Sequence, residues 1–449
     1  MKIRTLFPLL ALLVPVLKAE TLVVLSGNSI QEKIDAASDG DIIAIFGGTY
    51  DQNIIVNKKV RLVELAGQDV YITGSVTFTG LESTPLFQGF RVGSINVRGS
   101  EGLVIKDVYS DSDIILWGNG TPDVSIVGGS HGSILQRAGT LVTNTTTIRD
   151  SFNVQEGAVK TIAFRSTVLG VCNWAGTNSK GWFGYGSARR FSFGGDQCNF
   201  IVIGSIVDVK GSRNDRSSGF VIRSERSKCV ITNSAVFGVY QESNPNSDGS
   251  ECVVFADAPE SEVILRNNYF SMTTQYYDQG RFTILLQSLS KGVVSNNFLY
   301  IARSENSGSS QLLGGTFVTA PFGITVSNNH LATFAQSSRG YSPTSGGAKS
   351  SFMTVKHGVT SSGDLLVNNE PLKPVVSEFL TDLGDPDPRY NDLDGSRNDI
   401  GPSGGAWYDP EGWTTENPVV ISFDLSPDQV VGGVNDEVEI SEIQAISAP

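Results

Sequence analysis

The sequence contains few histidines and cysteines, the residues that bind zinc and supply reactive thiols. Its 449 residues include three histidines and four cysteines, and none of their spacings resembles a zinc site. Charged residues make up only 18% of the chain, and no long helical periodicity follows the first forty residues. These shortages argue against a zinc protein and a helical fold. The 49 glycines, with many serines, threonines and asparagines, instead favour short strands and frequent turns.

Basic residues are also outnumbered. The chain has 33 lysines and arginines against 46 aspartates and glutamates, a net charge of −13. Residues 1–19 carry three of the basic residues and no acid, so their removal leaves −16. A strongly acidic protein is repelled by phosphate backbones and by anionic lipid surfaces. We therefore expect neither nucleic acid nor an anionic membrane as a partner.

The first nineteen residues have the pattern of a secretory signal. Lys2 and Arg4 form a basic start, Leu6 to Leu17 form an apolar run, and Ala19 is a small residue before the cut. An uncleaved membrane anchor is the alternative, although the run is short for a bilayer span. No later apolar stretch is long enough for a transmembrane helix, so we expect a secreted protein, extracellular or periplasmic, without membrane insertion.

The four cysteines, Cys172, Cys198, Cys229 and Cys252, lie in the middle third of the chain. Export permits disulfide bonds. Cys198 and Cys229 stand at similar distances before repeated positions, so this pair is the best placed to bond if coils stack about 4.8 Å apart. For the other two, buried free thiols are an equal alternative.

A short phrase recurs along the chain: an apolar doublet or triplet, a small or amide residue, and a second apolar stretch. Self-similarity of this kind is typical of a solenoid, in which each repeat buries its apolar face on its neighbours. The small or amide residues that we align in one column are Asp107, Gly128, Asp150, Ser166, Gly204, Asn233, Asn267, Asn296, Asn328 and Asn368. Early steps are short and later steps are longer, which predicts loops on the second half. The 38-residue step from Ser166 to Gly204 leaves room for an extra coil.

The asparagines of this column recur at coil spacing. We predict that they stack inside the solenoid as an amide ladder, each side chain bonding the next. An asparagine metal site is the alternative.

The start of the mature chain contains one convincing helix. Ser29-Ile30-Gln31-Glu32 is a capping box, and Ile30, Ile34 and Ala37 line one face. The stretch from Ser29 to Leu62 resembles the N-terminal cap of the right-handed parallel β-helix (pectate-lyase-like) superfamily, and in particular the opening of the alginate and chondroitin lyases. The resemblance implies an all-β, right-handed parallel β-helix with a capping helix, and it implies acidic polysaccharide as the partner.

The pattern divides the chain into four parts. We predict a signal peptide over 1–19, the β-helix with its cap over 20–378, an acidic turn-rich terminating segment over 379–409, and a short β appendage over 410–449. The appendage is too short for an independent sandwich, so we expect a hairpin on the end of the solenoid.

The residues most suited to a binding site lie between 172 and 228, where aromatic residues among glycines precede a rare cluster of cations. Aromatic faces stack on sugar rings and guanidinium groups grip carboxylates, so this region suits an acidic sugar polymer. The predicted substrate-binding residues are Trp174, Trp182, Tyr185, Arg189, Arg190, Arg216 and Arg226. The alternative is a solvated loop whose aromatic residues fold over an extra coil.

β-Elimination from a uronate needs a cation on the carboxylate and a base that removes a proton. The predicted catalytic residues are Lys210, Arg213, Arg223 and Lys228. The lysines, or Tyr185, are the candidate bases and the arginines the candidate clamp, because arginine does not easily lose its proton. Residues 355–358, Val-Lys-His-Gly, resemble only in part the Arg-His-Gly phrase of the alginate and chondroitin lyases.

Hydrolysis by two carboxylates is a second route. Asp107, Asp111 and Asp113 alternate, so on a strand they would share one face. Residues 129–132, Gly-Ser-His-Gly, superficially resemble a polygalacturonase phrase. The other motifs of that family are absent, and an outward acidic ribbon is the alternative.

A metal site is predicted in the terminating segment. Asp392, Asp394 and Asp399 are the candidate ligands, and calcium is the cation that such carboxylates suit. The spacing does not match an EF-hand loop, and a hydrogen-bonded turn is the alternative.

Together these observations predict a secreted, monomeric β-helix protein that binds or degrades polysaccharide, with a lyase of acidic glycans as one form. A non-catalytic surface, adhesive or structural solenoid is the alternative, because no complete catalytic set is present.

Overall fold

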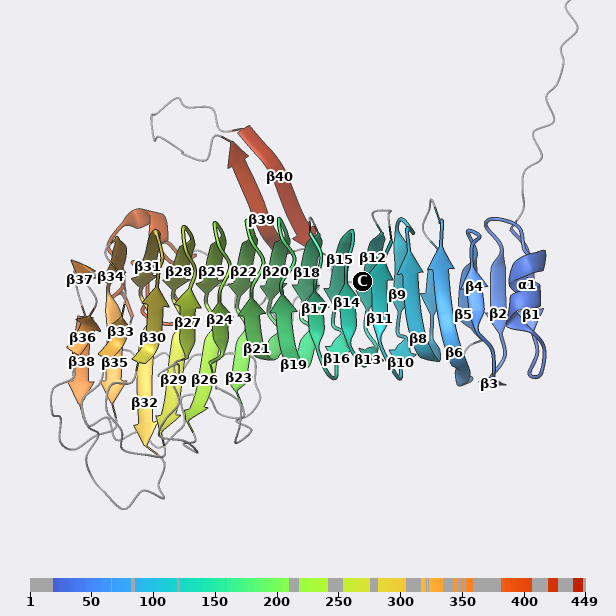
Figure 1. Cartoon of the computed structure of the whole chain (residues 1–449), viewed down its shortest axis with the longest axis horizontal. Coiled ribbons are helices and arrows are strands. Elements are labelled where there is room, and N and C mark those ends of the chain that lie inside the picture. The colour runs from blue at the N-terminus through green and yellow to red at the C-terminus, as the bar shows by residue number, and fades with distance from the viewer. Residues whose placement is uncertain are drawn as a thin grey trace, which may run out of the picture.

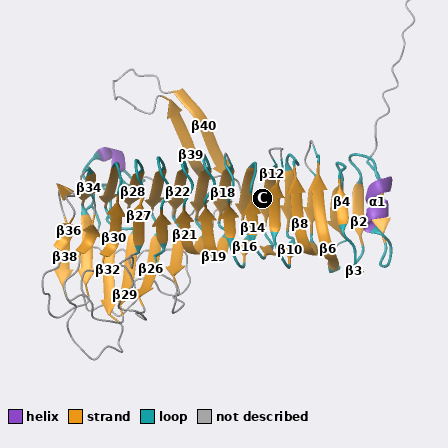
Figure 2. Cartoon of the chain, viewed as in Figure 1, coloured by secondary structure: helices purple, strands orange, loops and turns teal. Residues whose placement is uncertain are grey.

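The computed structural model is a right-handed parallel β-helix, which confirms the predicted fold class. The chain winds into stacked coils that form a straight rod (Figure 1), and strands make up nearly all of its regular structure (Figure 2). The structure describes residues 19–65, 67–81, 85–118, 122–157, 159–209, 218–240, 253–274, 282–303, 316–319, 321, 323–333, 342–345, 349–350, 353–357, 381–405, 419–426 and 439–446.

One face of the rod is a single parallel sheet, here called sheet A. Each of its strands pairs in register with the strand one coil later, so every coil adds one strand. In order, the strands are β1 (Thr21–Val24), β2 (Ile42–Ile45), β5 (Arg61–Glu64), β7 (Leu86–Gln88), β9 (Leu103–Lys106), β12 (Asp123–Val127), β15 (Thr140–Asn144), β18 (Lys160–Phe164), β20 (Lys180–Gly184), β22 (Asn199–Ile203), β25 (Lys228–Thr232), β28 (Glu262–Arg266), β31 (Lys291–Ser295), β34 (Ile324–Ser327) and β37 (Lys349–Ser350).

The other two faces, B1 and B2, belong to one sheet that bends around a corner. Four long strands contribute to both faces: β6 (Val70–Thr79), β8 (Phe90–Arg98), β19 (Thr167–Trp174) and β21 (Ser187–Phe193). Face B1 also contains β3 (Gly48–Tyr50), β10 (Tyr109–Ser110), β13 (Ser130–His131), β16 (Thr147–Ile148), β23 (Ile206–Val209), β26 (Ala235–Tyr240), β29 (Tyr269–Thr274), β32 (Phe298–Arg303), β35 (Asn329–Thr333) and β38 (Met353–His357). Face B2 also contains β4 (Ile54–Val56), β11 (Ile114–Trp117), β14 (Ile134–Gln136), β17 (Phe152–Val154), β24 (Phe220–Ile222), β27 (Val254–Asp257), β30 (Phe282–Gln287), β33 (Thr316–Thr319) and β36 (Ser342–Ser345).

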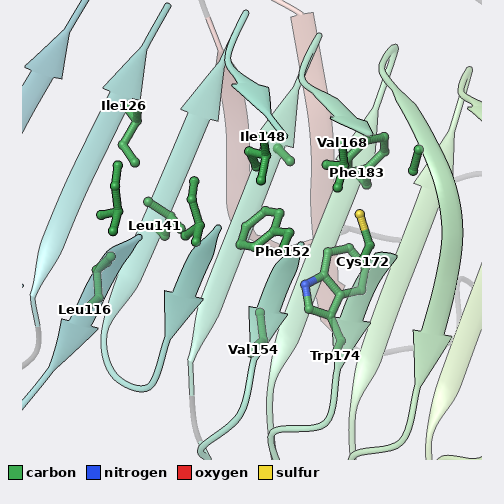
Figure 3. Close-up of a cluster of buried hydrophobic side chains, with 14 of the residues drawn as sticks. Leu116, Ile126, Leu141, Ile148, Phe152, Val154, Val168, Cys172, Trp174 and Phe183 are labelled. Carbon is green, nitrogen blue, oxygen red and sulfur yellow. The ribbon is translucent and has the colours of Figure 1, made fainter. Parts of the chain in front are cut away.

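The core runs the length of the rod. Alternate residues of each strand point inward, and like positions of successive coils stack into apolar columns. Figure 3 shows one part of it, where Ile148, Phe152 and Val168 meet side chains of the neighbouring coils. Because each column is continued by the next coil, a coil has a complete core only between its neighbours.

The predicted cap helix is α1 (Ile30–Ala36). The Ser29 hydroxyl accepts a hydrogen bond from the Glu32 amide at 3.2 Å, as the capping box predicts. Ile30 and Ile34 are fully buried, and α1 packs against β1, β2 and β4 at the open end of the stack. The helix therefore closes the apolar core at that end.

The turn that leaves sheet A has a left-handed residue in each coil from β9 to β34. These residues are Asp107, Gly128, Thr145, Arg165, Tyr185, Gly204, Asn233, Asn267, Asn296 and Asn328, with φ between +47° and +69°. Asparagine and glycine tolerate this conformation best, which explains why they recur. Tyr185 marks the extra coil that the 38-residue step left room for. Asp150 and Ser166 do not occupy this position, so their place in the predicted column is wrong.

The amide ladder exists, but one residue later than predicted. Asn268, Asn297 and Asn329 are the fully buried asparagines that stack. The amide Nδ2 of Asn268 donates to Oδ1 of Asn297 at 3.0 Å, and Nδ2 of Asn297 donates to Oδ1 of Asn329 at 2.9 Å. The preceding asparagines are the left-handed ones, whose side chains turn outward. Asn368 and Asn369 lie outside the described residues.

Residues 381–405, here called the strap, run back along the outward-facing asparagines. The amide of Asp385 donates to Oδ1 of Asn296 at 2.9 Å. Nδ2 of Asn267 donates to Oδ1 of Asn398 at 2.8 Å, and Nδ2 of Asn233 donates to the carbonyl of Gly404 at 2.7 Å. The strap thus passes over three successive coils toward the N-terminal end. It contains one short 3-10 helix, η3 (Pro388–Tyr390), whose Tyr390 ring lies 3.8 Å from the Arg266 guanidinium carbon.

The final strands, β39 (Val419–Ser426) and β40 (Glu439–Ile446), form an antiparallel hairpin. A hairpin was predicted here, and its predicted place on the end of the solenoid stays a prediction. Figure 1 shows the two strands lying next to each other.

No disulfide joins Cys198 and Cys229, so that prediction is also wrong. Cys172, Cys198 and Cys229 are free and buried. Cys229 pairs in register with Phe200 and points into the core, whereas the Cys198 thiol donates to the Gly176 carbonyl at 3.0 Å. Cys252 lies outside the described residues.

Candidate functional site

The predicted aromatic site is divided between the core and the outside of sheet A. Trp174 is 1% exposed, and its ring lies 5.4 Å from Phe200 and 5.3 Å from Phe193. It alternates with outward residues on β19 and therefore points inward. Its assignment to a sugar-binding surface is wrong. Trp174 fits the alternative, in which the aromatic residues fold over an extra coil.

Trp182 and Tyr185 lie outside the core but are covered. Trp182 faces outward from β20 and is 5% exposed, and its indole lies where a side chain at Gly184 would stand. Phe164 stacks with it at 6.1 Å and meets the Tyr185 ring edge-on at 6.0 Å. Together with Ile162 and Ile203 these residues form a closed apolar cluster. A sugar cannot stack on Trp182 or Tyr185 in this state.

The predicted cations that the structure describes do not converge. Arg226 pairs with Asp196, and Lys228 lies 3.7 Å from the carboxylate of Glu262 on sheet A. Arg223 is exposed at the end of face B2, with its guanidinium carbon 5.8 Å from the Phe255 ring. Arg189 and Arg190 lie at the bend of β21, where B1 meets B2. Lys210, Arg213 and Arg216 lie outside the described residues, so the catalytic set stays a prediction.

The residues considered for hydrolysis have structural roles. His131 is fully buried, and its Nδ1 lies 3.0 Å from the Ser110 hydroxyl; burial, followed by the charge of Arg149, lowers its pKa to about 4. Asp113 accepts a hydrogen bond from the Ser133 amide, and Asp107 is a left-handed turn residue. Asp111 pairs with Arg91.

The strap aspartates accept backbone hydrogen bonds. Asp394 binds the amide and hydroxyl of Ser396, and Asp399 binds the amide of Asp382 at 2.7 Å. Asp392 accepts from the amides of Gly405 and Asp399, and burial raises its pKa to about 6. Across the described part of the chain, no three His, Cys, Asp or Glu side chains are grouped to hold a metal ion. Calcium binding stays a prediction.

An exposed aromatic and cationic column lies elsewhere, on face B1 near the N-terminal end. Its members, Tyr71 of β6, Arg91 of β8 and Tyr109 of β10, occupy one register position in three successive coils. We call them the tyrosine column. Tyr109 is 56% exposed, and the Arg91 guanidinium carbon lies 4.7 Å from the Tyr71 ring centre. The next coils continue the column with the small hydroxyl residues Ser130 and Thr147, so the Tyr109 ring borders a flat surface.

Asp111 fixes this column from the adjoining loop. It accepts hydrogen bonds from the Tyr71 hydroxyl at 2.9 Å and from Arg91 Nε at 3.0 Å. Arg149, two coils later, donates to the carbonyls of Ser110 and Asp111 at 2.6 and 3.1 Å and holds the loop in place. The side chains are therefore positioned before any ligand arrives.

The electrostatics of the column suit binding rather than proton transfer. Burial raises the pKa of Asp111, but hydrogen bonds from Tyr71 and Arg91 outweigh it and the pKa lies below its ordinary value. The hydrogen bond to Asp111 raises the pKa of Tyr71. Asp111 is thus a paired carboxylate and Tyr71 a neutral donor, and neither is a free base.

Sequence reasoning missed the tyrosine column because its members are about twenty residues apart and each is ordinary alone. Asp111 was considered, but only as part of a carboxylate ribbon. The available signal was the coil period: aligning 71, 91 and 109 at that spacing places two tyrosines and an arginine on one face.

No family model matches the sequence, and no curated protein matches it. Among solved structures, the crystal structure of pectate lyase Pel9A aligns with 86% of this chain and 96% of that chain, at 14% identity and a TM-score of 0.29. No residue role is transferred from this likeness. None of the helices in the described residues has the length and apolarity that a membrane crossing requires.

Proposed function

We propose that this protein is a secreted polysaccharide-binding β-helix that holds a sugar chain against face B1 at the tyrosine column. The observation that carries the proposal is an exposed tyrosine ring, Tyr109, beside an arginine and a tyrosine that Asp111 holds in place. Aromatic faces stack on the apolar face of a sugar ring, and fixed donors bind its hydroxyls. The flat hydroxyl strip beyond Tyr109 leaves room for the chain to continue along the rod.

Binding without catalysis is the form that the described residues favour. The tyrosine column contains a paired carboxylate and a neutral phenol, whereas β-elimination requires a free base. The lyase hypothesis depends on Lys210, Arg213, Arg223 and Lys228, and it is tested separately by looking for unsaturated uronate products.

The test is the affinity of the purified protein for a panel of neutral and acidic polysaccharides, measured by affinity electrophoresis. We expect Tyr109→Ala to weaken binding about tenfold, the loss that one stacking contact explains. Leu169→Ala is the matched control, since Leu169 is 57% exposed on β19. Equal affinities of wild type, Tyr109→Ala and Arg91→Gln for the polymers that bind would overturn the proposal.

A further inference from the structure

A second column, with one exposed and two half-buried members, lies on face B2 of the same coils. Its members are Arg98 at the end of β8, Trp117 at the end of β11, and Arg137 directly after β14. We call them the arginine column. Trp117 pairs in register with Arg98, and Leu116 pairs with Gln136, so Arg137 follows at the level of Trp117 one coil later. The two arginines are thus two coil spacings apart, roughly 10 Å.

Trp117 orients the first arginine. The Arg98 guanidinium carbon lies 3.9 Å from the indole ring, the distance of a stacked cation–π pair. A guanidinium that stacks by its face keeps its N–H groups directed sideways, where they can form two parallel bonds to one anionic group. Arg98 is exposed, so these N–H groups face solvent.

The charges of both arginines are poorly neutralised. In the described ranges no carboxylate lies within 4.0 Å of Arg98. Arg137 meets Glu156 only at 3.9 Å, beyond hydrogen-bond distance, and its Nε is buried without a hydrogen-bond partner, whereas 39% of its side chain is exposed. Two such cations on one face contrast with the net charge of −13 of the whole chain. The exposed guanidinium of Arg98 and the exposed part of the Arg137 side chain are able to bind an anionic group.

We infer that the arginine column binds the carboxylate or sulfate groups of an anionic polysaccharide. Two guanidinium forks separated by two coil spacings suit a polymer whose anionic groups recur at regular intervals. Nucleic acid fits less well, because its affinity depends on neutralising many phosphates and the chain as a whole repels them. The inference rests on the proposed function only for the sugar nature of the ligand. It adds a second contact that selects charged chains.

The test compares dextran, dextran sulfate and polygalacturonate, with single-stranded DNA as a further polyanion. The variant Arg98→Gln/Arg137→Gln should lose at least tenfold in affinity for dextran sulfate or polygalacturonate and keep its affinity for dextran. The salt dependence of anionic polymer binding should become shallower by about two counterions. Arg61→Gln/Lys59→Gln removes the same charge near the start of sheet A and should change little.

The outcomes separate the two proposals. Unchanged binding of both anionic polymers by the arginine variant overturns the inference, whatever Tyr109→Ala does. Tighter binding of DNA than of either anionic polysaccharide also overturns it. If Tyr109→Ala is without effect while the arginine variant loses anionic binding, the proposed function fails and the inference holds. Trp117→Phe gives an independent readout: wild-type fluorescence should change on adding dextran sulfate, and this change should be smaller in the variant.

Discussion

The two halves of the rod use different side chains at the turn that leaves sheet A. In the first half, the residue after the left-handed position varies from coil to coil, and where it is Thr146 or Ser166 its hydroxyl binds a nearby carbonyl. In the second half, Asn268, Asn297 and Asn329 stand there and bind one another from coil to coil. The first half therefore depends mainly on apolar stacking, whereas the second half adds a continuous buried amide network.

The difference shows where the stability of each half is concentrated. A hydroxyl that binds a local carbonyl can be lost at the cost of one hydrogen bond, about 1 kcal/mol. A ladder asparagine also satisfies backbone groups of its neighbours: Asn297 accepts from the Asn268 amide and donates to the Leu265 carbonyl. Its loss leaves several buried groups without partners in a region of low dielectric.

The largest expected effect is that of Asn297→Ala. We expect a loss of at least about 3 kcal/mol in the free energy of unfolding, because donors and acceptors on both neighbouring coils lose their partners at once. Ser166→Ala, the corresponding change in the first half, should cost about 1 kcal/mol. Chemical denaturation followed by circular dichroism measures both. Equal losses would show that the two halves do not differ in this way.

The second effect concerns His131, a buried neutral histidine of the first half. Its pKa lies below that of the unfolded chain, so its contribution to stability is complete above about pH 6.5 and is lost as the pH falls toward 4. The loss across this window should reach about 3 kcal/mol. In His131→Gln the same pH range should have a smaller effect on the unfolding midpoint. A variant with the full wild-type pH dependence would place the acid sensitivity in another group.

A smaller effect is expected where the strap meets the second half. Asn267→Gly keeps the left-handed backbone but removes the side-chain bonds to Asn398 and to the Asp399 carbonyl. We expect about 1–2 kcal/mol of lost stability and faster proteolysis within the strap. Gly204, in the same column, shows that glycine suits the backbone there. Proteolysis at the wild-type rate would mean that the asparagine contacts do not hold the strap.

The smallest effect is that of Asp392→Asn. Because the pKa of Asp392 is raised to about 6, the proton it binds stabilises the strap below about pH 4, and this contribution is lost as the pH rises through 6. The uncharged amide keeps an acceptor for Gly405 and should stabilise the strap at pH 7 by no more than about 1 kcal/mol, after allowance for solvent screening. Thermal melts with and without calcium measure this. A melting temperature that calcium raises in wild type but not in Asp392→Asn would instead support the predicted metal site.

The fold could be predicted because its signal is repeated in every coil. The ladder was misplaced by one residue because the sequence shows two adjacent asparagines and not which of them has positive φ; that conformation turns Asn267 outward and Asn268 inward. The site was harder to predict for the same reason. Trp174 and Trp182 have similar glycine-containing surroundings in the sequence. The alternation of side chains along their strands nevertheless places Trp174 in the core and Trp182 outside it. Tyr109 became recognisable only when its coil neighbours Tyr71 and Arg91 were known.

The strap has a mechanical consequence. Its contacts with Asn296, Asn267 and Asn233 lie on three successive coils, so it acts as a splint parallel to the long axis. Bending the rod at these coils, or pulling the coils apart, strains the hydrogen bonds of the strap together with those between the strands. The first half relies on strand pairing and core contacts to resist the same force. Under tension we expect the rod to give way first on the side of the splint that leads toward the cap.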